Sequence, residues 1–134
     1  MKYLLDTNIV AYIIKRKPVE VFDKLSTVSW DEIGISSIVV AELWYGVAKS
    51  QHKERNKAAL ENFLAPFTIL DFDTSAAEQY ALIRANLEEK GTVIGANDLL
   101  IAAHALSQDL VLVTNNVREF ERVENLRIEN WVTE

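Results

Sequence analysis

The segment KYLLDTN at residues 2–8 places a short apolar run directly before a carboxylate, Asp6. Tyr3, Leu4 and Leu5 are apolar at successive positions, which is typical of a strand buried on both faces, as in a parallel sheet. Ligands of open α/β sheets bind at the carboxyl ends of the strands. We therefore expect Asp6 to be the first of several carboxylates at that edge. The alternative is that Asp6 or Thr7 simply caps the helix that follows.

Composition limits the class of protein. A length of 134 residues predicts a single domain over residues 1–134, and 49% apolar residues predict a globular chain. The absence of cysteine excludes disulfides and thiolate metal sites. No signal-peptide pattern and no apolar run of about 20 residues is present, so we expect a cytoplasmic protein with no membrane partner. The net charge of −6 argues against general coating of polyanions, but it is compatible with a nuclease that has a local basic patch.

Apolar runs and helix-period patterns alternate along the chain, which predicts an α/β fold with parallel strands. The expected strands after the first are 33–36, 67–70 and 110–113, with a short strand or tail at 126–131. The first three expected helices are 7–16, 18–25 and 37–49. A fourth begins within the polar segment 51–57 and ends before Pro66. A fifth has the capping box Ser75-x-x-Glu78 and ends at Gly91, and a sixth begins at Asn97-Asp98.

Three further carboxylates are candidates for the same edge of the sheet. Glu42 shares a helix face with mainly apolar neighbours, so either a cation meets it or the helix turns it towards water. Asp98 lies in the first turn of an apolar helix, where the helix dipole alone would also favour an anion. Glu119 follows a strand and the polar turn Thr114-Asn115-Asn116. Parallel strands with helical crossovers can bring elements of this kind to one edge.

A cluster of carboxylates predicts a cation. Two carboxylates about 4 Å apart repel by roughly 4 kcal/mol at an effective dielectric constant of 20, so protons or a cation must enter the cluster. Oxygen ligands without cysteine or paired histidine suit Mg²⁺ or Mn²⁺, and such a site suits phosphodiester hydrolysis. We expect His104 to serve packing, because it does not share a helix face with Asp98. The phosphate-binding motifs GxxxxGK[ST] and GxGxxG are absent.

Four segments together carry a resemblance to a known family. LLDTN at 4–8, ISSIVVAELWYG at 35–46, GANDLLIAAHA at 95–105 and VTNNVREFERVENLRIENW at 113–131 resemble PIN-domain toxins of the VapC type in order and spacing. The resemblance covers essentially the whole chain. It implies a PIN-like three-layer α/β/α sandwich with a short, mainly parallel sheet, and a Mg²⁺- or Mn²⁺-dependent endoribonuclease held inactive by a VapB-type antitoxin.

The resemblance also implies roles for single residues. The acidic positions of the family fall on Asp6, Glu42 and Asp98, with Asp6 and Asp98 as metal ligands. Many PIN domains have an aspartate where this chain has Asn116, so we expect Glu119 to be the fourth catalytic acid, acting through a water molecule. One firmly bound ion, with a second arriving with substrate, is the expectation that follows. Hydrogen-bonding support is expected from four residues: Thr7, Asn8, Thr114 and Asn116.

The C-terminal segment resembles the enterobacterial branch, which cleaves initiator tRNA in its anticodon stem–loop and so inhibits translation. Family members form homodimers that assemble with the antitoxin into a larger complex, and only the antitoxin would contact operator DNA. An acidic pocket would accept an antitoxin Arg or Lys in place of the metal. The candidate RNA contacts are cationic residues whose alternative role is helix capping or solubility: Lys15, Arg16, Lys17, Lys49, Lys53 and Arg55.

Three rival functions remain on the sequence alone. A receiver-like signalling domain needs a second Asp beside Asp6 and a Lys after a late strand, and neither is present. A PIN domain that only binds protein or RNA would bind metal without cleaving. The third rival keeps the nuclease chemistry and changes the substrate to mRNA, rRNA or another tRNA.

Overall fold

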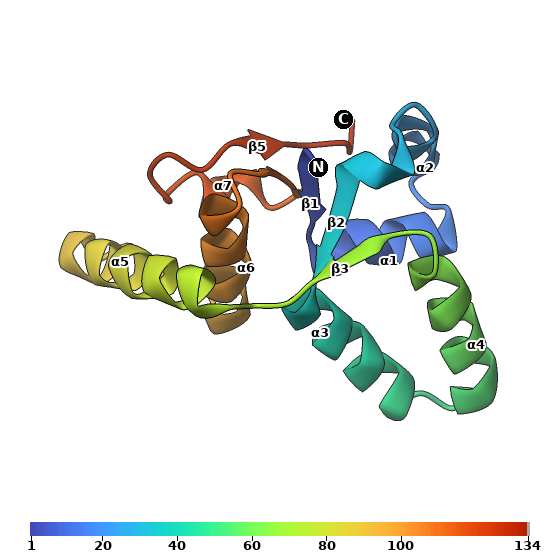
Figure 1. Ribbon diagram of the computed structural model, residues 1–134. Coiled ribbons are helices and arrows are strands. Elements are labelled where there is room, and N and C mark those ends of the chain that lie inside the picture. Colours follow the sequence, from blue (N-terminus) through green and yellow to red (C-terminus); the bar gives the residue numbers. More distant parts are fainter. Residues whose placement is uncertain (134) are drawn as a thin grey trace.

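The computed structural model describes residues 1–133, which form five strands, seven α-helices and one 3-10 turn (Figure 1). The strands are β1 (Tyr3–Leu5), β2 (Ile33–Ser36), β3 (Thr68–Leu70), β4 (Val111–Val113) and β5 (Ile128–Glu129). The helices are α1 (Thr7–Lys15), α2 (Val19–Ser26), α3 (Ser37–Ala48), α4 (Lys53–Leu64), α5 (Thr74–Lys90), α6 (Ala96–Ser107) and α7 (Val117–Phe120), and the 3-10 turn η1 is Trp30–Glu32.

All five strands are parallel, in the order β3-β2-β1-β4-β5, which confirms the α/β prediction. The chain builds outwards from β1 to β2 and β3, and then returns to the other side of β1 with β4 and β5. The order therefore reverses between β1 and β4, and the crevice outside the carboxyl ends of two such strands is where open α/β sheets bind ligands. Asp6 and Thr114 are the residues that directly follow these two strands.

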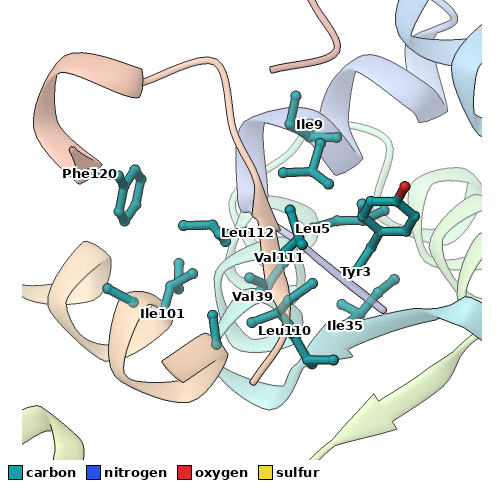
Figure 2. Packing of buried hydrophobic residues seen from close by; sticks show 14 of the residues in the cluster. Tyr3, Leu5, Ile9, Ile35, Val39, Ile101, Leu110, Val111, Leu112 and Phe120 are labelled. Atoms are coloured by element: carbon teal, nitrogen blue, oxygen red, sulfur yellow. The ribbon is translucent and has the colours of Figure 1, made fainter. Parts of the chain in front are cut away.

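Helices cover the strands from both sides. In Figure 1, α5 and α6 lie on one side of the strands and α1 and α4 on the other, which matches the expected sandwich. Figure 2 shows side chains of β1, β2 and β4 packed among helix residues such as Ile9, Val39 and Ile101. Leu4 and Leu5 have no exposed surface, as the apolar run that precedes Asp6 predicts.

One local expectation differs from the structure. The capping box at Ser75 is wrong: α5 begins earlier, and its cap is Asp73, whose side chain accepts a hydrogen bond from the Ala76 N–H at 3.0 Å. The reason is that Asp73 and Ser75 can both cap, and the short path from β3 starts the helix at the first of them. The connection between α2 and β2 contains the turn η1. The predicted end of α5 at Gly91 is confirmed by its left-handed φ of 69°.

Within residues 1–133, none of the helices combines the length and the apolar composition needed to cross a membrane.

Candidate active site

Asp6 lies at the carboxyl end of β1 and has two structural roles. Its Oδ1 accepts a hydrogen bond from the Ile9 N–H at 2.9 Å and so caps α1, while its Oδ2 accepts one from the Thr114 hydroxyl at 2.5 Å. Only 5% of the residue is exposed. Burial, together with the nearby charge of Glu42, raises the pKa of the Asp6 carboxyl above its ordinary value. The hydrogen bonds from Thr114 and Ile9 lower this pKa but do not cancel the rise. Helix capping and a place in the acidic cluster are therefore both features of this residue.

Thr114 and Asn116 connect Asp6 to the next carboxylate. Thr114 is fully buried after β4, and its hydroxyl donates to Asp6 while it accepts from the Asn116 N–H at 3.0 Å. The Asn116 side-chain amide in turn donates to Glu119. Since an aspartate at position 116 would repel Glu119, the asparagine is the residue type that this geometry needs.

Glu119 and Asp98 form a pair. Glu119 lies on α7 and accepts the Gly95 N–H at 2.7 Å, and it also makes a side-chain hydrogen bond with Asp98 in the first turn of α6. Burial, the hydrogen bond with Glu119 and the charges of Glu119, Asp6 and Glu42 raise the pKa of Asp98 to about 7. Burial acts in the same direction on Glu119, but the hydrogen bonds from Gly95, Asp98 and Asn116 outweigh it and lower the pKa of Glu119. The pair therefore holds a proton on Asp98 up to neutral pH.

Glu42 projects from α3 towards the same cluster, since its charge raises the pKa of both Asp6 and Asp98. Its Oε1 is buried and has no hydrogen-bond donor within residues 1–133. The Thr7 hydroxyl, one residue after Asp6, is also buried and has no hydrogen-bond partner within residues 1–133. Buried acceptors without a donor are unfavourable, so these two oxygens are available to a ligand.

These residues fit a hard divalent cation by their chemistry. The cluster supplies carboxylate and hydroxyl oxygens, it concentrates negative charge, and two of its buried oxygens lack a partner. In the part of the chain that the structure describes, no three acidic or histidine side chains already stand together as a ready set of ligands.

The structure places the other predicted residues outside this cluster. Asn8 is exposed, and it meets Asp6 through its backbone N–H only. His104 is fully buried, packs edge-on against Phe72 and shares a hydrogen bond with Ser36, which agrees with the packing role. The cationic candidates are all exposed, at the end of α1 and around the turn from α3 to α4: Lys15, Arg16, Lys17, Lys49, Lys53 and Arg55.

Sequence reasoning missed Gly95 as a part of this cluster. Its N–H is the backbone donor to Glu119, and a Cβ at this position would stand 3.5 Å from Asp98 Oδ2 and 3.6 Å from Glu119 Oε1. The signal available in the sequence was a glycine at the N-cap of the helix that carries Asp98.

Comparison with known proteins gives consistent matches over nearly the whole chain. The family model described as "PIN domain" matches residues 3–126. Ribonuclease VapC2 of Haemophilus influenzae is 52% identical over 98% of this chain and 99% of its own length. The tRNA(fMet)-specific endonuclease VapC of Salmonella typhimurium is 46% identical, with 98% of each chain covered. A chain in the crystal structure of VapBC2 from Rickettsia felis bound to a promoter DNA fragment superposes with a TM-score of 0.92 at 47% identity, over 98% of this chain and 100% of that one.

Proposed function

This chain belongs to the PIN-domain family, in its VapC ribonuclease branch, and we propose on that premise that it is a toxin that inhibits translation by cutting an RNA. One observation carries the proposal for this chain's own residues. Asp6, Glu42, Asp98 and Glu119 bring four carboxylates to the same crevice, where Glu42 Oε1 is buried without a donor among the described residues and Gly95 and Asn116 hold Glu119. An enzyme that cuts phosphodiesters with a divalent cation needs such a concentration of negative oxygens.

We propose Asp6 and Asp98 as metal ligands, with Glu42 completing the acidic set, and Mg²⁺ or Mn²⁺ as the ion. Both ions favour carboxylate oxygens. The bound ion supplies charge neutralisation at the phosphate and activation of the attacking water. Thr114 holds the Asp6 carboxylate in place through the hydrogen bond to Oδ2, and Asp6 is further fixed by its cap on α1.

Glu119 has a different proposed role, because Gly95 and Asn116 already donate hydrogen bonds to it. A carboxylate held in this way stays ionised at neutral pH and can orient a water molecule by accepting a hydrogen bond from it. We therefore assign Glu119 to the orientation of a water molecule and of Asp98. Asn116 and Thr114 are positioning residues, and Thr7 is an additional oxygen beside Asp6.

The substrate that we propose is initiator tRNA, cut in its anticodon stem–loop in the cytoplasm. Support comes from a relative of 46% identity that is named for tRNA(fMet) and that matches this chain over 98% of its length. The alternative is the same chemistry on rRNA, mRNA or another tRNA, because surface loops that the acidic cluster does not fix can select the RNA.

The partner that we propose is a VapB-type antitoxin, which would insert a cationic side chain into the acidic crevice. VapBC complexes from other bacteria, including one bound to promoter DNA, contain chains with the same fold. We further propose a homodimer that joins the antitoxin in a larger complex, with operator DNA contacted by the antitoxin.

An in vitro cleavage assay tests this function. The purified chain, freed of antitoxin, is mixed with unfractionated tRNA in Mg²⁺, in Mn²⁺ or in EDTA, and the new RNA ends are sequenced. Asp6→Asn is the inactive variant, and Asp23→Asn, an exposed position on α2, is the control for loss of one charge. A single cut in initiator tRNA that disappears with EDTA and with Asp6→Asn supports the proposal. Binding of metal without cleavage of tRNA, rRNA or mRNA would replace the nuclease with a binding module.

A further inference from the structure

An open groove of about 300 Å³ lies between α3 and α6 and leads to the acidic cluster. Its lining residues are Ile38, Ala41, Glu42, Tyr45, Asn97 and Leu100. Glu42 is itself a member of the cluster, and Asn97 is the chain neighbour of Asp98. The groove has a mainly apolar wall with polar groups at these two residues. Its volume is at the lower end of the roughly 300–1,000 Å³ typical of small-ligand sites, which suits one nucleotide rather than a duplex.

Tyr45 is the aromatic side chain of this groove. It lies three residues after Glu42 on α3, so the two side chains share a helix face. The residue is 66% exposed, which makes it one of the most exposed large apolar residues in residues 1–133. Single exposed apolar residues are common on protein surfaces, so the exposure alone is not evidence of a site. The informative feature is the combination of an exposed ring with a groove that contains a cluster carboxylate.

Lys49 supplies positive charge at the same place. Its ammonium lies over the Tyr45 ring at 4.9 Å from the centroid, in a cation–π contact. An RNA strand that approaches four carboxylates needs cations beside its phosphates. Because Lys49 lies next to the Tyr45 ring, it can contact a phosphate of an RNA strand whose base lies on that ring. Lys49 is exposed and is the last residue of the turn that ends α3, so it can leave the ring to meet a phosphate.

We propose that Tyr45 is a stacking platform for one unpaired RNA base next to the phosphodiester that is cut, with Lys49 contacting the flanking phosphate. Asn97 provides the hydrogen-bonding group at the other wall of the groove. This inference rests on the proposed ribonuclease function and names a binding subsite for it. The base has to be unpaired, because paired bases are stacked on their neighbours and their faces cannot reach an aromatic side chain.

Binding of RNA by a cleavage-inactive protein gives the first test. In the Asp6→Asn background, a short single-stranded RNA that carries 2-aminopurine reports stacking by its fluorescence. Removing one base–aromatic stack weakens binding on the order of 10-fold or more. We expect that loss in Tyr45→Leu, full affinity in Tyr45→Phe, and a weaker dependence on salt in Lys49→Gln. Trp30→Leu is the matched control, because Trp30 is an aromatic residue that is 54% exposed and lines a different groove.

Cleavage kinetics of the otherwise wild-type chain on initiator tRNA give the second test. Tyr45→Leu is expected to raise KM by a similar factor and to leave metal-induced stabilisation unchanged, and Tyr45→Phe is expected to restore KM. Unchanged RNA affinity in Tyr45→Leu would overturn the inference. A loss of affinity that accompanies conversion of a dimer to a monomer in sedimentation would also overturn it, because the ring would then be a contact between protein chains. If the wild type cuts no RNA, the proposed function fails first, which separates that failure from failure of the subsite.

Discussion

Replacing Asp98 by asparagine is predicted to stabilise the metal-free protein while abolishing its activity. Asparagine has nearly the shape of the protonated aspartic acid, and its amide can donate to Glu119 as that acid does. The pKa of Asp98 is raised from 3.8 to about 7, and each unit corresponds to about 1.4 kcal/mol. The full shift would be about 4 kcal/mol, but water reaches this half-buried group, so we expect about 1–2 kcal/mol.

The sign of the pH dependence follows from the raised pKa. The folded protein retains the Asp98 proton at a pH where the unfolded chain has lost it, so the stability that this group contributes is complete below about pH 4 and is lost as the pH rises to about 7. The advantage of Asp98→Asn over the wild type is therefore near zero at pH 4, grows between pH 4 and 7, and is constant above that. At pH 8 it corresponds to a rise in Tm of roughly 3–8 °C for a chain of this size.

Thermal unfolding in EDTA from pH 4 to 9 measures this difference, and Asp23→Asn controls for the change in net charge. Addition of Mg²⁺ should raise the Tm of the wild type and should reduce the advantage of the variant, because the ion binds only the folded state. A variant that is less stable than the wild type at every pH would contradict the destabilising role of the Asp98 charge. Asp98 would then act mainly through the helix dipole of α6, worth about 0.3–1 kcal/mol.

Of three further predictions, two concern neighbours of the acidic cluster and one concerns the buried histidine His104. Thr114→Val should lower the free energy of unfolding by about 1–3 kcal/mol in urea titrations, because it removes the buried donor to Asp6. Thr114→Ser keeps the hydroxyl and should restore most of that free energy. Equal losses in the two variants would contradict the hydrogen-bond role. Asn116→Asp should lower the Tm at pH 8 in EDTA, because it replaces a donor to Glu119 by a like charge, and the deficit should shrink when Mn²⁺ is added; an unchanged Tm would argue against this contact. Burial lowers the pKa of His104 below its ordinary 6.5, so the stability that depends on its neutral form is present above about pH 6.5 and is lost below it. His104→Leu should therefore lose less stability than the wild type between pH 7 and pH 5, and an equal loss in chemical denaturation would contradict this.

The sheet and the acidic set could be predicted from the sequence because their signals are local. The run at Tyr3–Leu5 is apolar at successive positions and stops at a carboxylate, and the structure gives a fully buried strand followed by Asp6. Glu42 and Asp98 were predicted from an acidic residue in apolar helical surroundings. The structure brings both of them near Asp6, as their shared effects on pKa values show.

Other features depend on how distant segments meet, so the sequence carries no signal for them. The contact of Glu119 with Gly95 joins residues 24 positions apart through a backbone N–H. Every residue except proline has a backbone N–H, so the residue type at position 95 does not predict this contact. The interaction of Asp98 with Glu119 depends on the first turn of α6 meeting α7. The cap of α5 shows the converse case, because Asp73 and Ser75 both carry local capping signals and only the path of the chain selects Asp73.

We expect the carboxylates that meet at the β1–β4 crevice, Asp6 and Asp98 with Glu42, to bind a divalent cation in exchange for a proton. Isothermal titration calorimetry of the antitoxin-free wild type with Mn²⁺ at pH 6.5, in two buffers with different ionisation enthalpies, measures both the ion and the proton. We expect saturable binding of Mn²⁺ with release of part of a proton, and loss of that proton release in Asp98→Asn. Absence of binding, or binding that is identical in the wild type and in Asp98→Asn, would contradict it.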